Sequence, residues 1–255
     1  MINQLKTLLL LGILTGLLLV IGQFFGGSQG LTIAVLFSVL MNFGAYFFSD
    51  KIVLKMYGAK EAKKSEYKEL HELVEETSKK AGLPKPKIFI IPTNTPNAFA
   101  TGRNPKNAVV AFTEGIMKLL SKEELEGVIA HELAHVKNRD ILITTIAATI
   151  AGVISYIAQM SQWFFFTGQN DNREGNNIVS LLLLMIITPL VAMIIQMAIS
   201  RSREFLADET GARTIQNSKG LASALKKLEA GVKTFPLRRG NPSTSSLFIV
   251  NPFSA

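Results

Sequence analysis

Two of the three histidines in this chain lie four residues apart, in a pattern that can bind a metal ion. Residues 131–135 are His-Glu-Leu-Ala-His. Residues four apart in a helix differ by only about 40° around its axis, so both imidazoles can point at one ion. Glu132 is displaced around the helix and can serve as a general base toward a zinc-bound water. The pattern predicts a zinc hydrolase with His131 and His135 as ligands and Glu132 as the catalytic residue.

A third ligand is needed, because a catalytic zinc usually has three protein ligands and one open position. The chain has no cysteine, and the remaining histidine, His71, falls in a predicted surface helix. A carboxylate is therefore expected, and the candidates are Glu204, Asp208 and Glu209. Glu204 and Asp208 are four residues apart, so one can bind the metal while the other accepts a hydrogen bond from a ligand imidazole. Spacing alone leaves this choice open, since each carboxylate can instead pair with a nearby arginine.

Four long apolar blocks surround these residues, at about 8–25, 31–48, 141–166 and 178–199. None contains a charged residue, and each has about the 18 residues that a bilayer crossing requires. The first block could be a cleaved signal peptide, but another apolar block follows it almost at once. The last two could be a buried helical pair, but the chain has little other material to cover them. We therefore predict four membrane helices.

Basic residues next to the apolar blocks predict the orientation. They follow the second and fourth blocks at Lys51, Lys55, Lys60, Lys63, Lys64, Arg201 and Arg203. Such residues favour the cytoplasmic side, so both termini and both large polar segments are expected there. The net charge of +8 then fits a lipid bilayer as the partner, and no nucleic acid is expected.

This topology divides the chain into four parts. A transmembrane hairpin spans 1–49, and a second spans 141–199. Cytoplasmic catalytic regions occupy 50–140, with the histidine motif, and 200–255, with the carboxylate candidates. An outer loop joins the third and fourth blocks, so both return to one membrane surface. The two halves of the metal site are thus expected to converge.

Local patterns outline the catalytic region. Residues 59–81 have apolar side chains at helical spacing and predict an amphipathic helix. Residues 86–92 predict a strand, and 97–102 with 107–113 predict a β-hairpin. A Ser-x-x-Glu capping box at 121–124 opens the helix that carries the metal-binding motif. If that helix continues past the motif, it leads directly into the third apolar block.

Four segments resemble those of the HtpX family of membrane zinc endopeptidases, which is related more distantly to the CAAX prenyl endopeptidases. They are NAFATG at 97–102, VAFTEGIMKLLSKEEL at 110–125, GVIAHELAHVKNRD at 127–140 and SRSREFLAD at 200–208. The resemblance covers nearly the whole chain. It implies an α+β membrane protein, mainly helical, with four transmembrane helices. A cytoplasmic zincin-like (gluzincin) catalytic domain with a small β-sheet completes the expected fold.

The resemblance also implies roles for individual residues. One Zn²⁺ per chain would be bound by His131, His135 and Glu204, with Glu132 as the catalytic glutamate. Asp208 would support the site. An edge strand beside the active helix would hold the substrate main chain, here at Asn97, Ala98 and Phe99. Arg213 is a candidate for stabilising the oxyanion. Members of the family usually continue past the position of Ala255 with a His-Pro segment.

The implied function is a membrane-bound zinc endopeptidase that cuts misfolded or membrane proteins at the cytoplasmic face of a prokaryotic inner membrane. In this family such cleavage serves protein quality control, often under heat or envelope stress. One alternative is a CAAX-type prenyl-protein peptidase, which would need a larger membrane chamber than four helices can enclose. The other is a non-catalytic zinc-binding membrane scaffold. The sequence does not indicate an oligomeric state.

Overall fold

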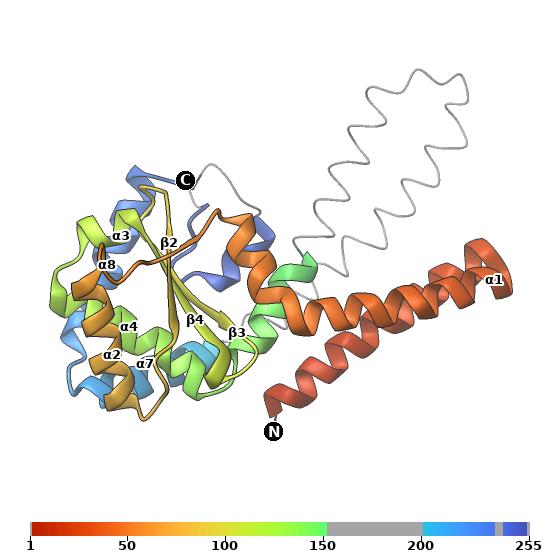
Figure 1. Cartoon of the computed structure of the whole chain (residues 1–255), viewed down its shortest axis with the longest axis horizontal. Coiled ribbons are helices and arrows are strands. Elements are labelled where there is room, and N and C mark those ends of the chain that lie inside the picture. Colours follow the sequence, from red (N-terminus) through yellow and green to blue (C-terminus); the bar gives the residue numbers. More distant parts are fainter. Residues whose placement is uncertain (1, 152–200, 238–241, 254–255) are drawn as a thin grey trace, which may run out of the picture.

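A computed structural model describes residues 2–151, 201–237 and 242–253 (Figure 1). A long helical hairpin projects from a body in which helices surround a small sheet. The helices of the described part are α1 (Ile2–Met56), α2 (Lys68–Ala81), α3 (Glu114–Leu119), α4 (Lys122–Lys137), α7 (Arg201–Ile215) and α8 (Lys219–Thr234). A further helical segment covers Ile141–Ala151. This mostly helical architecture with one small sheet agrees with the predicted fold class.

The hairpin consists of the two arms of α1. Gly27 separates them with a non-helical backbone at φ 55° and ψ −139°, a conformation that glycine adopts without steric cost. Between the arms, the amide of Asn42 donates a hydrogen bond of 2.7 Å to the hydroxyl of Thr15. The second arm, Gly26–Met56, is long and apolar enough to cross a membrane. It is the one helix of the described residues that meets this criterion, because the third and fourth apolar blocks fall mostly in 152–200, outside them.

The sheet is mixed and has the order β1-β2-β4-β3. Its strands are β1 (Lys60–Glu61), β2 (Lys87–Ile91), β3 (Ala98–Gly102) and β4 (Ala108–Thr113). Strands β3 and β4 pair antiparallel, which confirms the predicted hairpin, while β2 and β4 pair parallel. Val110 and Phe112 pack into the core beneath α4, and Val109 and Ala111 pack on the opposite face. Because both faces are covered, β4 is buried throughout, and β3 forms the end of the sheet.

The predicted helix at 59–81 was wrong in its first third. Its first residues form β1 and pair with β2, and the helix begins only at Lys68. Backbone pairing with a neighbouring strand overrides the local helical pattern there. His71, expected on the solvated face of this helix, contacts the carbonyl of Ala62 at 2.8 Å through Nε2. It therefore attaches the short strand to α2.

Helix α4 begins at the predicted capping box. The amide of Glu124 donates to the Ser121 hydroxyl at 3.3 Å, and the amide of Ser121 donates to the Glu124 carboxylate at 2.9 Å. Glu124 also accepts hydrogen bonds from Ser223 and Lys227 of α8. The bond from Lys227, aided by these neighbours, lowers the pKa of Glu124 to about 2. One side chain thus starts the metal-motif helix and attaches it to α8.

Candidate metal centre

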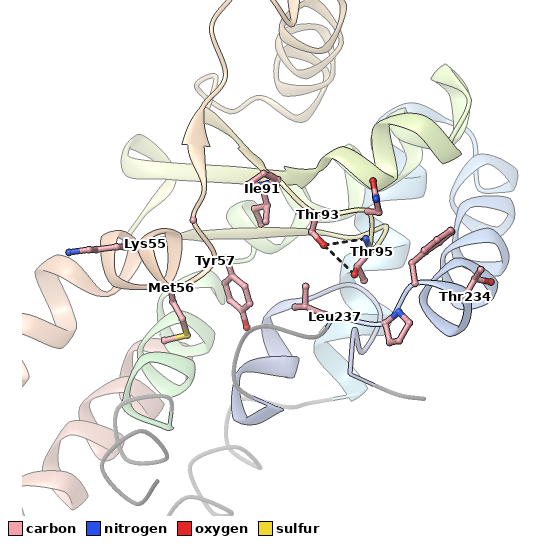
Figure 2. Close-up of a pocket in the computed structure, with 13 residues that line it drawn as sticks. Lys55, Met56, Tyr57, Ile91, Thr93, Thr95, Thr234 and Leu237 are labelled. Carbon is pink, nitrogen blue, oxygen red and sulfur yellow. Dashed lines mark hydrogen bonds between the residues drawn. The ribbon is translucent and has the colours of Figure 1, made fainter. Parts of the chain in front are cut away.

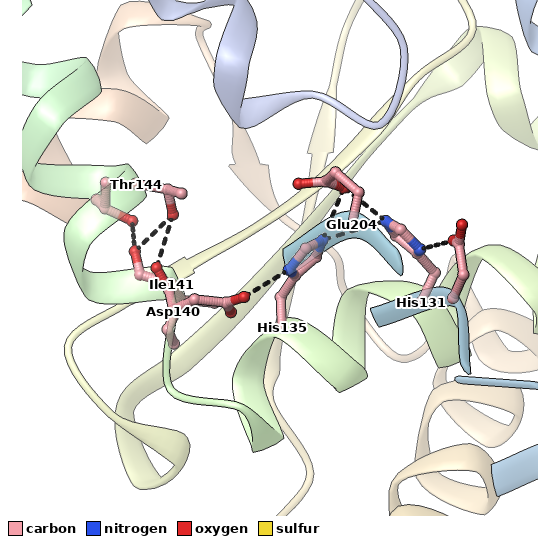
Figure 3. A network of polar contacts seen from close by, with 8 residues as sticks. His131, His135, Asp140, Ile141, Thr144 and Glu204 are labelled. Atoms are coloured by element: carbon pink, nitrogen blue, oxygen red, sulfur yellow. Dashed lines mark hydrogen bonds and ion pairs between the residues drawn. The ribbon is translucent and has the colours of Figure 1, made fainter. Parts of the chain in front are cut away.

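Three side chains from two separate helices converge at one point (Figure 3). The Nε2 atoms of His131 and His135 on α4 are 3.1 Å apart, and they lie 3.7 and 3.5 Å from an oxygen of Glu204 on α7. Zinc–nitrogen bonds of 2.0–2.1 Å in a tetrahedral site place neighbouring ligand atoms about 3.3 Å apart. The triangle therefore has the size, and the three donors have the chemistry, of a zinc site.

Close packing of α7 on α4 brings the carboxylate to the histidines. The face of α7 that meets α4 carries Ala207, which is fully buried, and Gly211. A Cβ atom at Gly211 would lie only 3.1 Å from backbone atoms of Ala130 and His131. Lack of a side chain at this position lets the two backbones approach, and Glu204 and Asp208 then reach the imidazoles.

Each imidazole is held at its other nitrogen by an aspartate. His131 Nδ1 lies 2.9 Å from Asp208, and His135 Nδ1 lies 3.1 Å from Asp140. Such carboxylates fix the tautomer and the ring orientation of a metal ligand. The sequence points to Asp208 but not to Asp140, because a helix that continued past the motif would turn Asp140 away from His135. A carboxylate five residues beyond the second histidine was the available signal.

Glu132 is buried beside the cluster and only 2% exposed. Burial raises the pKa of its carboxyl, while the charges of His131 and His135 oppose this shift. The backbone N–H of Ala100 on β3 donates a hydrogen bond to the carboxylate. A buried acid with a raised pKa beside metal ligands has the properties of a general base.

The pKa values of His135 and Glu204 are shifted by burial and by the contact between the two side chains. Burial lowers the pKa of His135, but hydrogen bonds with Asp140 and Glu204 outweigh it and raise the pKa to about 10. Burial raises the pKa of Glu204, but the hydrogen bond with His135 and the charges of His135, His131 and Arg203 together outweigh it, so this pKa falls. The two shifts have the same origin, because an imidazole and a carboxylate in contact each stabilise the charged form of the other.

The residues expected to hold substrate lie at the start of the end strand β3, directly before Ala100, which lines the cavity over the cluster. Ala98 accepts a hydrogen bond of 3.2 Å from the amide of Ile249, and Asn97 donates one of 2.6 Å to the carbonyl of Val250. Phe99 is fully buried against Tyr57. The C-terminal segment thus already pairs with the first part of this edge. The cavity over the cluster, about 30 Å³, has room for about one water.

Comparison with known proteins identifies the family. Residues 64–250, most of the chain, match peptidase family M48. The chain belongs to that family. It is similar to proteins named "Protease HtpX homolog" from Desulforapulum autotrophicum (54% identity, covering 99% of this chain and 82% of the relative) and Pyrococcus furiosus (52%, 97% and 86%). A third, from Persephonella marina, is 55% identical over 98% of this chain and 88% of the relative.

Family membership makes this chain a membrane-bound metalloprotease and confirms the resemblance described above. A solved structure titled "Crystal Structure of S. mikatae Ste24p" is also similar, with a TM-score of 0.49 and 21% identity. That likeness covers 96% of this chain and 62% of the other.

The other residues considered for this M48 site lie elsewhere. Glu209 pairs with Arg213 at 2.6 Å on the exposed surface of α7. Arg213 is nine residues from Glu204, about 13 Å along the helix, so the structure does not bring it to the cluster as an oxyanion donor. His71 is occupied with Ala62. The group within the described residues that could hold a metal ion is therefore His131, His135 and Glu204.

A larger cavity lies away from the cluster, beside the end of α1 and the loop after β2 (Figure 2). Its volume is about 640 Å³, and its lining includes Tyr57, Ile91, Thr93 and Leu237. Among the described residues that line it there is no histidine and no carboxylate. Size therefore does not identify the reacting site in this enzyme, and the chemistry of the side chains does.

Proposed function

We propose that this metalloprotease is a zinc endopeptidase whose zinc is bound by His131, His135 and Glu204, one ion per chain. The observation that carries the proposal is the triangle of donor atoms with sides of 3.1, 3.5 and 3.7 Å. Its size agrees with zinc bond lengths, and its two imidazoles and one carboxylate are a ligand set of zinc peptidases. Asp208 orients His131 in this arrangement.

Zinc bound there would supply Lewis-acid polarisation of the scissile carbonyl and lower the pKa of a water. The carboxylate of Glu132 takes the proton of the attacking water and passes it to the leaving amine. The N–H of Ala100 orients this carboxylate. The buried position of Glu132 excludes bulk water, which keeps the proton between the carboxylate and the reacting groups.

The test of this function is removal and return of the metal. The purified full chain is incubated with an unfolded model protein, with and without a zinc chelator, and cleavage is followed by mass spectrometry. We expect cleavage to stop on chelation and to return on addition of Zn²⁺, because metal binding to such a site is reversible. Cleavage that continues unchanged in the metal-free protein would contradict the proposal.

The substrates are proposed to be misfolded or membrane proteins, bound as extended chains along the edge of β3 at residues 97–101. Pairing with a strand edge uses main-chain hydrogen bonds and requires no particular side chains. That suits a quality-control enzyme that accepts many damaged proteins, including under stress. Since Ile249 and Val250 pair with Ala98 and Asn97, a peptide at that part of the edge must take the place of this segment.

Replacing Ala100 by proline tests the edge. The N–H of Ala100 points to Glu132 rather than into the sheet, so proline removes no strand hydrogen bond but fixes φ and alters the edge. We expect kcat/KM to fall at least about tenfold, because the lost N–H orients Glu132 and general-base catalysis contributes 10²–10⁴-fold. Zinc content and Tm should stay near wild type. A rise in KM supports peptide pairing. A fall in kcat with unchanged KM would reject pairing and leave only the bond to Glu132.

We further propose four membrane passages in a prokaryotic cytoplasmic membrane, with both termini and the active site on the cytoplasmic side. The support is the apolar helix Gly26–Met56, the charge-free blocks at 141–166 and 178–199, and the basic residues beside them. The apolar side chains of α1 are mostly exposed, as a helix surrounded by lipid requires.

Cysteine labelling tests this topology, and the absence of native cysteines gives a clean background. Single cysteines replace Ser65, Ser218 and Asn170, and an impermeant thiol reagent is added to intact cells or to inverted vesicles. We expect Ser65→Cys and Ser218→Cys to react only in inverted vesicles, and Asn170→Cys only in intact cells. Reaction of all three from outside would refute the four-helix arrangement, and the unmodified protein is the control.

A further inference from the structure

A tight turn joins the metal-motif helix to the next apolar helix. Helix α4 ends at Lys137, and the amides of Asn138 and Arg139 donate to carbonyls of the last turn of α4. Arg139 has φ 59°, in the left-handed region that residues other than glycine seldom adopt. The amide of Asp140 then donates to the carbonyl of His135 at 3.2 Å. The turn therefore folds Asp140 back onto the second metal-binding histidine.

The carboxylate of Asp140 contacts the imidazole on the side away from the metal position (Figure 3). Its Oδ2 lies 3.1 Å from His135 Nδ1, while His135 Nε2 faces His131 and Glu204. Asp140 is 1% exposed, so water does not compete for this contact. The arrangement matches that of Asp208 with His131, but Asp140 comes from the connection between helices rather than from α7.

The contact with His135 replaces the usual N-cap interaction of the Asp140 carboxylate. Asp140 is the residue before the helix Ile141–Ala151, and its carbonyl accepts the first helical hydrogen bond, from the amide of Thr144. An aspartate at this N-cap position normally caps the free amides of the first turn with its carboxylate. Here Oδ2 contacts His135 instead, and Oδ1 accepts no hydrogen bond from the described residues.

The charge of Asp140 is balanced from α7. The guanidinium of Arg203, the residue before Glu204, interacts electrostatically with Asp140. A buried carboxylate is costly unless it is paired, and Asp140 has both the charge of Arg203 and the Nδ1 atom of His135 as partners. Two adjacent residues on α7 thus act on the site: Glu204 is a proposed metal ligand, and Arg203 supplies the counter-charge for Asp140, which contacts His135.

We propose that Asp140 is a positioning residue that holds the Nδ1 proton of His135, turns Nε2 toward the metal, and ties the metal site to the start of helix Ile141–Ala151. This inference rests on the proposed zinc site. An aspartate that fixes the tautomer keeps the Nε2 lone pair free for the ion. Because the same residue begins the apolar helix, displacement of that helix would displace a metal ligand.

Zinc affinity measured by competition with a chelating dye tests the assignment. Asp140→Ser keeps a residue suited to the N-cap but removes the carboxylate. We expect the zinc Kd to rise about 10–100-fold, as loss of such partners typically causes. The visible spectrum of the Co²⁺-substituted protein should shift as well, because the orientation of one imidazole changes. Asp140→Asn keeps an acceptor oxygen and the N-cap, and should restore part of the affinity.

A control variant separates positioning from folding. Glu124→Gln lies on the same helix as His135 and loses the negative charge that pairs with Lys227, so it should lower the Tm yet leave the zinc Kd and the Co²⁺ spectrum unchanged. If Asp140→Ser fails to fold, Asp140→Asn decides, with a weaker affinity and a shifted spectrum expected. Unchanged Kd and spectrum in the Asp140 variants overturn this inference alone. A wild-type protein that binds no zinc overturns the proposed metal centre and the inference with it.

Discussion

Cleavage is expected to fall by about 10²–10⁴-fold in Glu132→Gln, the range that general-base catalysis contributes. Glutamine has the shape of glutamate and can still accept the hydrogen bond from Ala100, but it cannot take a proton from water. Zinc should remain bound, because the ligand atoms belong to His131, His135 and Glu204. The measurement is kcat/KM on an unfolded protein together with zinc per chain.

The matched control for that variant is Glu123→Gln, an exposed carboxylate near the start of the same helix. It should keep full activity and zinc content. If Glu132→Gln retains most of its activity, Glu132 is not the base. If it loses zinc along with activity, its role is in the structure of the site rather than in proton transfer.

Loss of zinc is the expected result for Glu204→Ala. The variant removes one of three ligands, so its zinc affinity should fall further than the roughly 10–100-fold typical of outer partners such as Asp208. The zinc-free protein should still fold, because the side chain of Glu204 is 56% exposed and supports little packing. Zinc per chain, measured after dialysis against a weak chelator, tests this.

Glu209→Ala is the control for the third ligand. Its side chain lies on the same helix as Glu204, is 57% exposed and pairs with Arg213. We expect normal zinc content and normal cleavage in this variant. The reverse outcome, with zinc lost in Glu209→Ala and kept in Glu204→Ala, would show that Glu209 and not Glu204 is the third ligand.

Part of the catalytic region follows directly from local patterns. The capping box at Ser121 and Glu124 starts α4 as predicted. The hairpin of β3 and β4 also forms, because successive apolar residues point to opposite faces of the sheet and both faces are buried. Local pattern failed at residues 60–61, where pairing with β2 replaced a helical start. The spacing of residues within a segment does not indicate whether a distant strand will form backbone hydrogen bonds with it.

The sequence by itself determined the family and the likeness to a zinc hydrolase. His131 and His135 must share a face wherever a helix forms, because the geometry of one turn is local. The apolar blocks likewise required an apolar environment whatever their packing. These conclusions depend on neighbours in the chain, and no distant contact can change them.

Only the tertiary structure decided which groups complete the proposed metal centre. Glu204 reaches the histidines because Gly211 lets α7 approach α4, and spacing alone could not choose it over Glu209. Asp140 reaches His135 because the chain turns at Arg139 instead of continuing as a helix. Both contacts join atoms that helical periodicity does not bring together. The packing of one backbone on another and one left-handed residue place these carboxylates, which is the physical reason that residue spacing did not determine them.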